Sequence, residues 1–536
     1  MVAWGLGGGK RCGAVAGVGR GERWASLRSA PTYDGAQLTG LIVEVFRKFS
    51  SVIVLINLKG VKMLLLDEIR DNWKLDAKTE NGHRYFYHIN EVDKIKNGKR
   101  SYVIGRKGTG KTAISEHIAS VREYDVFSEK LSFKNFPFNE LYNLKNAGYT
   151  APNQYITLWK YIIYSHICKM MSRNESVDAS VRDKLKAAFS PEPINSLQRW
   201  IKKWTAHDFS LTVFGVGGKM GFKENVENNS WIQKVDILES VIDDYIDNSS
   251  YYILFDELDE DYKNIIDPEQ RNNYTHLLTG LFKAVQDIKS IFREGGRRVY
   301  PVIFLRDDIY SIITDPDKTK WDDFKIELDW SRDRIKELLA FRISRAVGVG
   351  TPLMDFKSAW NKLFLDQSVF MGHMQNKSMT IFDFIERSTH LRPRDFVRYI
   401  HSCAENTPVN FSRISAKTVK DSDKAFSNYL KRELVDEIHG VIPDIQSILD
   451  IISQIRKQAF SEAEFREIFE KKKEEGSIVQ SDPVFILRIL FLFSIIGNQP
   501  KQKNQTVFRY LNKDAELNFS ENFVVHRGLY KALQIM

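Results

Sequence analysis

The sequence predicts a doubly wound α/β domain followed by a mainly helical region. Two unbroken apolar runs, YYILF at 251–255 and YPVIFL at 300–305, are typical of strands buried on both faces of a parallel sheet. Helical apolar spacing precedes the first run at about 231–247 and separates it from the second at about 270–293. This alternation favours a three-layer core, in which helices cover both faces of a parallel sheet.

Length and composition agree with an ordinary globular protein of about two to four domains. The chain has 536 residues, of which 43% are hydrophobic and 27% charged. Its cysteines, Cys12, Cys168 and Cys403, lie far apart without metal-ligand spacing, so we expect no disulfide framework, no zinc site and a cytoplasmic location. The apolar stretches at 40–66 and 484–496 are interrupted by charges or fall short of the ~20 residues that a bilayer demands, so we expect no membrane contact.

The formal net charge of +9 is distributed unevenly along the chain. Residues 1–62 contain nine Lys and Arg residues and three acidic ones, so the other 474 residues carry only +3. Net charge is therefore a weak argument for a nucleic-acid partner. Because residues 1–35 are rich in glycine and show little helical or strand period, we predict that 1–62 is a disordered or artefactual leader, with a transit peptide as the alternative.

Further elements complete the predicted core at 63–330. The run SYVIG at 101–105 predicts a short buried strand, and the apolar spacing after Lys111 predicts a helix. We expect an insertion at about 135–225 that contains helices and a hairpin. The remaining expected elements are a strand within 124–133, helices at 153–172 and 182–204, a hairpin at 210–224 and a strand at 324–330.

One octapeptide after the strand at 101–105 matches the phosphate-loop pattern G-x-x-x-x-G-K-[ST]. In such a loop, glycines let backbone N–H groups surround phosphate oxygens, Lys111 reaches the β and γ phosphates, and Thr112 ligates Mg²⁺. We therefore predict ATP and Mg²⁺ as ligands. The alternative is a glycine turn that opens an ordinary helix. The sequence contains no guanine-reading NKxD tetrapeptide, and GTP in place of ATP stays open. Two other glycine strings, GLGGGKRC at 5–12 and VGGKM at 216–220, lack the Ser or Thr after lysine. The predicted nucleotide-binding residues are Gly105, Arg106, Lys107, Gly108, Thr109, Gly110, Lys111 and Thr112.

A second acidic element follows the strand at 251–255. Asp256 leaves the strand end as the expected outer ligand of Mg²⁺, and Glu257 is placed to orient or deprotonate the attacking water. A merely solvated acidic loop is the alternative, because the segment DELDEDY holds several carboxylates. The apolar run that leads directly into Asp256 favours the functional interpretation.

With GRKGTGKT, YYILFDELDED and PVIFLRDDIY in this order, the chain resembles the AAA+-related P-loop ATPases over about residues 64–536. It is most similar to the prokaryotic STAND and KAP-like branch and more distantly to origin-recognition-type ATPases. The resemblance implies a sheet in which the phosphate-loop strand is central, flanked by the Walker B and sensor strands. It also implies a helical lid at 331–455 and a winged-helix domain at 456–536. At the C-terminus, two helical patterns followed by the β-like runs TVFRYLN and LNFSENFVVH agree with a winged helix.

The same resemblance implies two sensor arginines. Arg306 ends the strand after the acidic element, where a guanidinium can contact the γ phosphate; a local ion pair with the two aspartates that follow is the alternative. The lid segment HLRPRDFVRYI supplies Arg394, with Arg392 behind it, and a surface salt bridge to Asp395 or another acid is the alternative. The sequence assigns no arginine finger. The predicted catalytic residues are Lys111, Glu257, Arg306 and Arg394.

These motifs predict a regulatory ATPase in which nucleotide between core and lid holds one arrangement and loss of the γ phosphate releases it. The resemblance implies a role in prokaryotic defence or signalling, with a homo-oligomer and an effector protein as partners. The alternative is a DNA-binding initiator or transcription-type ATPase that uses the C-terminal winged helix. Lys471–Lys473, Lys501, Lys503 and Arg509 agree with DNA contact, but the glutamates around the lysine run equally predict a solvated helix face. A degenerate nucleotide-binding scaffold is disfavoured because the motif residues are intact.

Overall fold

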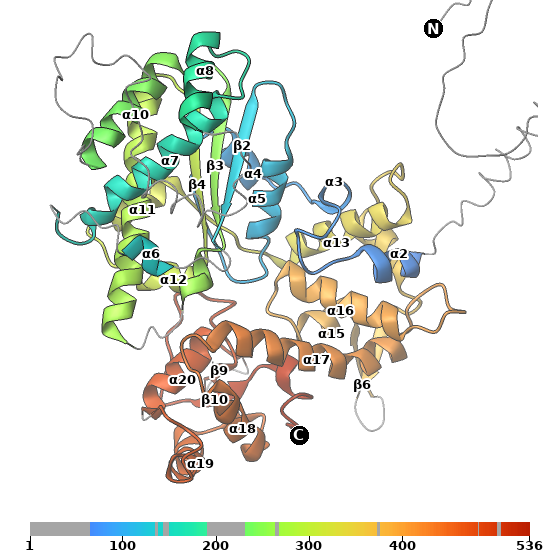
Figure 1. The fold of residues 1–536 in the computed structure, drawn as a ribbon. Coiled ribbons are helices and arrows are strands. Elements are labelled where there is room, and N and C mark those ends of the chain that lie inside the picture. The colour runs from blue at the N-terminus through green and yellow to red at the C-terminus, as the bar shows by residue number, and fades with distance from the viewer. Residues whose placement is uncertain are drawn as a thin grey trace, which may run out of the picture. The chain divides into compact units, whose positions relative to one another are not determined.

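A five-stranded parallel sheet forms the centre of the nucleotide-loop region (Figure 1). The strand order is β2-β3-β4-β1-β5, and all seven residues of β3 are buried, as its unbroken apolar run predicts. The predicted parallel α/β core is therefore confirmed. The strands are β1 (Tyr102–Ile104), β2 (Val126–Ser132), β3 (Ser250–Asp256), β4 (Val299–Leu305) and β5 (Lys325–Glu327).

The computed structural model describes residues 65–133, 138–142, 149–189, 231–262, 267–371, 376–480, 482–500 and 505–535. The expected leader at 1–62, the hairpin at 210–224 and most of the helix at 182–204 lie outside the described residues. Among the described helices, none has both the length and the apolar content required to cross a bilayer.

The strand order corrects one expectation. β1, which leads into the phosphate loop, was expected between the Walker B strand β3 and the sensor strand β4. Instead, β4 lies between β1 and β3, and the other neighbour of β1 is β5. Apolar runs identify buried strands but not their neighbours, because strand order depends on how each crossover connection returns to the sheet.

Helices cover both faces of the sheet (Figure 1). Residues that alternate along the strands divide between two hydrophobic clusters, so that Val103 and Leu254 face one layer while Tyr102 and Ile253 face the other. The first layer contains α4 (Asn90–Lys96) and α5 (Lys111–Ser120), and the second contains α7 (Ile156–Met171), α10 (Trp231–Tyr245) and α11 (Pro268–Glu294).

The helical region after the core begins with α13 and carries a small hairpin that the sequence did not predict. Its hairpin strands, β6 and β7, pair antiparallel. Two short helices precede the core: α2 packs against α13 and α16 of this region, and α3 packs against both α13 and α5. The elements are α13 (Arg332–Val347), α14 (Phe356–Leu363), β6 (Ser368–Met371), β7 (Lys377–Thr380), α15 (Ile381–Glu386), α16 (Pro393–Asn406), α17 (Ala416–Ile438), α2 (Leu65–Asn72) and α3 (Gly82–Tyr85).

The C-terminal elements run helix, strand, helix, helix, strand, strand. Their three strands form an antiparallel sheet in the order β8-β10-β9. The expected strand in TVFRYLN is only a single bridge from Val507 to Asn498. The second C-terminal helical pattern, DPVFILRILFLFSII at 482–496, forms a helix only as far as Leu492, because Ser494 has the left-handed φ of 57°. The elements are α18 (Ile445–Ile455), β8 (Ala459–Phe460), α19 (Glu462–Glu474), α20 (Pro483–Leu492), β9 (Ile496–Gln499) and β10 (Asn522–Val525).

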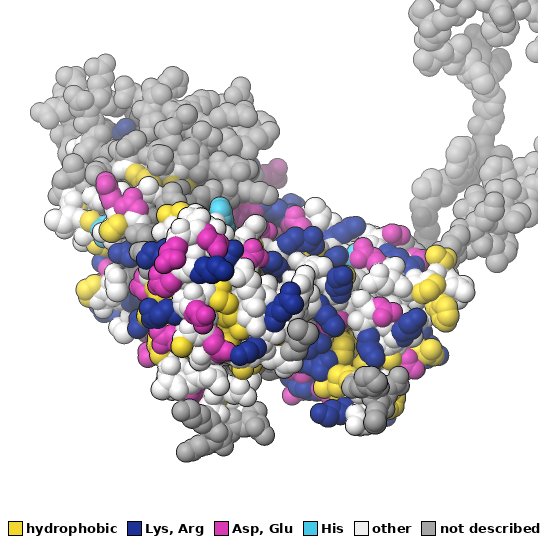
Figure 2. Space-filling view, turned by 90° about the horizontal axis from the view of Figure 1, so that it is seen from below, with side chains coloured by type: hydrophobic (Ala, Val, Ile, Leu, Met, Phe, Trp, Pro, Cys, Tyr) yellow, Lys and Arg dark blue, Asp and Glu magenta, His cyan; other side chains and the backbone are white. Residues whose placement is uncertain are grey.

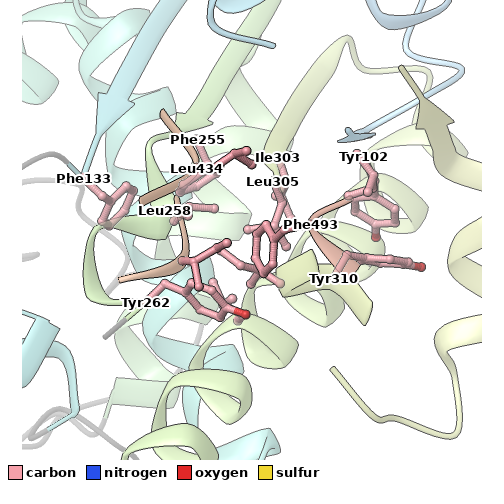
Figure 3. Close-up of a cluster of buried hydrophobic side chains, with 14 of the residues drawn as sticks. Tyr102, Phe133, Phe255, Leu258, Tyr262, Ile303, Leu305, Tyr310, Leu434 and Phe493 are labelled. Atoms are coloured by element: carbon pink, nitrogen blue, oxygen red, sulfur yellow. The ribbon is translucent and has the colours of Figure 1, made fainter. Parts of the chain in front are cut away.

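One hydrophobic cluster joins the sheet to the later helices (Figure 3). It runs from Phe255 and Ile303 on the sheet to Leu434 on α17 and Phe493 after α20. Each of these four side chains is at most 4% exposed. Apolar burial therefore links the core, the helices α13–α17 of the expected lid, called the lid below, and the C-terminal elements.

We predict that Gly528→Ala weakens the attachment of the C-terminal elements. A Cβ at Gly528 would lie 2.1 Å from the carbonyl oxygen of Ser388 and 2.7 Å from Leu430 Cδ2, so backbone must shift. Urea unfolding should show a loss of about 1–3 kcal/mol, the usual cost of overpacking. Gly350→Ala is the control, because its Cβ meets nothing within 4 Å. Equal stability of the two variants would contradict this packing.

Candidate functional site

The phosphate loop connects the end of β1 to the start of α5. Gly108 and Gly110 have φ values of 85° and 102°, a left-handed conformation that glycine adopts without steric cost. Gly110 is also the N-cap of α5, and no side chain caps this helix end. Backbone N–H groups at an uncapped helix N-terminus are suited to bind an anion.

Lys111 points back into its own loop. Its ammonium donates hydrogen bonds to the carbonyl oxygens of Gly105 at 2.6 Å and Arg106 at 3.0 Å. Burial lowers the pKa of Lys111. From the far side of the loop, the indole N–H of Trp330 donates to the carbonyl of Thr109 at 2.9 Å. The loop is thus held in place by its own lysine and by the residue stretch after β5.

A cavity of about 700 Å³ brings most of the predicted site residues together. Its size lies within the range of small-molecule sites. Among the predicted residues, Gly105 and Arg106 are not part of its lining. The predicted residues that line it are Lys107, Gly108, Thr109, Gly110, Lys111, Thr112, Asp256, Glu257, Arg306 and Arg394.

Asp256 ends β3 as a buried carboxylate that is 3% exposed. Lys130 on β2 forms an ion pair with it at 2.8 Å, and the Ser115 hydroxyl donates to it at 2.8 Å. Lys130 also pairs with Glu116. Burial acts to lower the pKa of Lys130, but the two carboxylates outweigh it and raise that pKa. The charge of Asp256 is therefore compensated by a lysine that the sequence reasoning did not consider.

The residues present fit Mg²⁺. Asp256 and Thr112 line the same cavity, and a carboxylate with a hydroxyl beside substrate phosphates is the ligand type that Mg²⁺ prefers. The ammonium of Lys130 contacts Oδ2 of Asp256, so a metal ion bound to that oxygen would compete with Lys130.

Glu257 has an unusual backbone and a crowded carboxylate. Its φ of 60° is left-handed, which is uncommon for a residue with a side chain and occurs often at functional sites. The ammonium of Lys78 contacts both carboxylate oxygens, at 2.7 and 2.8 Å, and the Ser132 hydroxyl donates to Oε2. Glu257 thus faces the cavity with its oxygens already engaged.

Arg306 forms the local ion pair that the sequence offered as an alternative to a sensor. Its guanidinium donates to both carboxylate oxygens of Asp308, at 3.0 and 2.6 Å. Glu437 on α17 lies 4.0 Å away, and Asp259 lies at 3.5 Å. Burial acts to lower the pKa of Arg306, but these carboxylates raise it well above its usual value. Arg306 lines the cavity and also links the end of β4 to the lid.

The two lid arginines, Arg392 and Arg394, pair with different carboxylates. Arg392, not Arg394, pairs with Asp395, and it also donates to the carbonyl of Lys107 at 3.1 Å. The Arg394 side chain pairs with Glu433 at 3.3 Å, and its backbone N–H donates to the carbonyl of Gly108 at 3.4 Å. The start of α16 therefore contacts the phosphate loop directly.

Arg106, within the loop, contacts elements from the lid and from the C-terminus. Its guanidinium donates to Nδ1 of His390 at 3.3 Å and lies 5.9 Å from the ring centre of Tyr510. Lys513, close to Tyr510 in sequence, pairs with Asp329 at 2.6 Å after β5. The loop therefore has neighbours in the core, in the lid and in the C-terminal elements.

Sequence reasoning missed several cavity residues. Lys78 and the aromatic pair Phe86 and Tyr87 line the cavity from the N-terminal side, and Phe86 stacks on His117 at 4.0 Å. The cluster HRYFYH just before the phosphate-loop strand was a usable signal, because aromatic side chains close to a phosphate loop can cover a base. Lys78 has no comparable signal.

Comparisons with known proteins give partial matches. The family model for the FunZ-associated C-terminal helical domain matches residues 333–435, from α13 into α17. The putative transposon gamma-delta 80.3 kDa protein of Escherichia coli (strain K12) is 22% identical in an alignment of 465 residues that covers 80% of this chain. The chain spans 61% of that relative's length.

Two solved structures are similar at low scores. A structure of the Aeropyrum pernix ORC1 protein in complex with DNA has a TM-score of 0.33 and 10% identity, over 83% of this chain and 91% of that one. A structure of Drosophila ORC bound to DNA has a TM-score of 0.27 and 12% identity, over 86% of this chain and 92% of that one. Superpositions at this level establish neither a shared fold nor a shared activity.

We predict that Lys130→Met destabilises the protein and increases its response to Mg²⁺. Removal of one partner from a buried ion pair costs about 3 kcal/mol, and Asp256 is then open to a cation. Urea unfolding with and without Mg²⁺ measures both effects. Lys160→Met is the control, because Lys160 is 17% exposed and pairs with Asp287, a carboxylate that does not line the cavity. An unchanged Mg²⁺ response in Lys130→Met would contradict the competition.

Proposed function

We propose that this protein is a P-loop ATPase that binds ATP with Mg²⁺ and hydrolyses the β–γ phosphoanhydride. The supporting observation is that Lys111, Thr112, Asp256 and Glu257 line one cavity although the loop and the acidic pair lie about 145 residues apart. Phosphoryl transfer requires phosphate-binding backbone groups, a cation, a metal ligand and a group that positions water. The cavity supplies residues for each role.

Each residue has a distinct part in this proposal. The loop N–H groups and Lys111 hold the β and γ phosphates. Thr112 and Asp256 would hold Mg²⁺, which when bound neutralises charge on the phosphate oxygens. Glu257 orients the attacking water and accepts its proton, once the contacts with Lys78 and Ser132 open.

We further propose that hydrolysis changes the position of the lid. Arg394 and Pro393 line the cavity from α16, and Arg306 lines it from β4 while it also approaches Glu437 of α17. A γ phosphate between these groups would compete with their carboxylate partners, so its loss would restore the present pairing. This supports a nucleotide-driven switch of the AAA+ type. A STAND-like or KAP-like regulatory role in defence or signalling, with self-association and an effector protein, is the biological setting we propose.

The alternative is a DNA-binding ATPase. The order helix-strand-helix-helix-strand-strand and the sheet order β8-β10-β9 support a winged helix over 445–535, which would include α18 rather than leave it in the lid. Its second helix after β8, α20, offers only Arg488 as a charged side chain, however, and most of its apolar residues are buried. Lys473 pairs with Glu470 of the same helix, and Lys472 pairs with Glu475 at the C-cap of that helix. Figure 2 shows basic and acidic side chains interspersed on the visible face.

The apolar composition of α20 favours packing against other parts of the protein over DNA contact, because base and phosphate contacts need polar or basic side chains on the contacting helix. DNA binding that weakens steeply with salt, measured on the full chain, would support the alternative. Absence of a complex with duplex DNA at low salt would eliminate it.

We predict that Lys111→Ala reduces Mg²⁺-dependent ATP turnover to background and weakens ATP binding, because the loop loses its phosphate-binding cation. A phosphate-release assay and a nucleotide-binding titration measure the two effects. Lys219→Ala, in the glycine string without a following Ser or Thr, is the control and should retain both. Normal turnover in Lys111→Ala would refute the assignment of the loop.

We also predict that Glu257→Gln retains ATP binding and loses turnover by about 10²-fold or more, the usual contribution of a general base. The amide keeps the size of the side chain but cannot accept the proton. Loss of ATP binding together with turnover would instead mean that Glu257 has a structural role.

A further inference from the structure

Lys78 approaches Glu257 from outside the sheet. Its ammonium lies 2.7 Å from one carboxylate oxygen of Glu257 and 2.8 Å from the other, and the Ser132 hydroxyl donates to the second oxygen as well. A carboxylate has about four lone-pair sites, so these contacts leave about one for water. In this arrangement Glu257 is poorly placed to orient a nucleophile.

The segment that carries Lys78 is attached to the lid. Arg70 donates to the carbonyls of Ala404 and Thr407 at 2.9 Å, at the end of α16. Glu80, two residues after Lys78, forms an ion pair with Arg342 of α13, whose side chain is 7% exposed.

Arg84 extends the same attachment beyond Glu80. Its guanidinium donates to the carbonyl of Arg345 at 2.8 and 3.1 Å, at the end of α13. The segment is therefore bound to α13 and α16 on both sides of Lys78, while Glu257 belongs to the sheet. The same segment also contacts the core after Lys78, because α3 packs on α5 and Phe86 stacks on His117.

From this geometry we propose that Lys78 is a positioning residue that holds Glu257 in an inactive pairing and withdraws when the lid moves. The inference rests on the proposed ATPase function. The contact joins this segment to the proposed catalytic carboxylate, so a lid movement that carries Lys78 away from the sheet would lengthen it. Because the side chains of Lys78 and Glu257 are 32% and 23% exposed, the pair is weak enough to open reversibly.

Steady-state ATP turnover of the full chain tests the proposal. Lys78→Met should raise kcat by up to about fivefold, the factor that corresponds to a partly exposed ion pair, with KM for ATP unchanged. Lys78→Arg keeps the pair and should behave as the wild type. Lys99→Met, at an exposed lysine in the turn before β1, is the matched control. A fall in kcat or a rise in KM for Lys78→Met would overturn the proposal, because Lys78 would then contact the phosphates.

Failure of the proposed function is recognised separately. If the wild type turns over ATP no faster than Lys111→Ala, the ATPase assignment fails. If the wild type is active but Lys78→Met is not faster, only the restraint fails.

A second measurement does not depend on turnover. A double-mutant cycle of Lys78→Met and Glu257→Gln, read by urea unfolding, should show coupling without nucleotide and none with Mg²⁺ and a non-hydrolysable ATP analogue. Absence of coupling in the nucleotide-free protein, or coupling that persists with the analogue, would overturn the proposal.

Discussion

A buried network of charges between the phosphate loop and the lid is the constraint on which the site depends. Arg392, 2% exposed, bonds Asp395 and the carbonyl of Lys107, and it lies 3.5 Å from Glu437. Glu437 lies in turn 4.0 Å from Arg306 at the end of β4. Burial would raise the pKa of Glu437, but Arg306 and Arg392 lower it. Because an unpaired charge in such a place is costly, the loop, β4 and α17 are held to one arrangement until other charges replace these partners.

The phosphate groups of a nucleotide are anions, so they can replace the carboxylate partners of these arginines. They would enter between Lys111 on the core side and Arg394 on the lid side, next to Arg306. The shared hydrophobic cluster of Figure 3 keeps the lid and the C-terminal elements attached while polar contacts at the cavity rearrange. Arg106 extends the same connection to His390 and Tyr510. Nucleotide binding at the loop can therefore change the polar contacts of the lid and the C-terminal elements while the apolar core stays intact.

Local patterns made the loop and the acidic strand end predictable. Lys111 lies in a contiguous motif, and Asp256 ends a fully apolar strand, so both could be placed from neighbouring residues alone. Lys78 and Glu257 are 179 residues apart, and Ser115 and Asp256 are 141 apart, so no local pattern relates them. The strand order that the resemblance implied was wrong, and the strand sequences could not correct it, since pairing between distant strands leaves little trace in either strand. The sensor roles of Arg306 and Arg394 stay predictions, although both side chains line the cavity.

The central claim, that the γ phosphate controls contact between the loop and the lid, is tested most directly by hydrogen–deuterium exchange of Glu257→Gln with Mg²⁺-ATP and with Mg²⁺-ADP. The account predicts different exchange in the two states at the start of α16 and the end of α17, where Arg394 and Glu437 lie. It predicts no such difference in Lys111→Ala. Identical exchange with ATP and ADP at both helix ends, in a protein that binds both nucleotides, would contradict it.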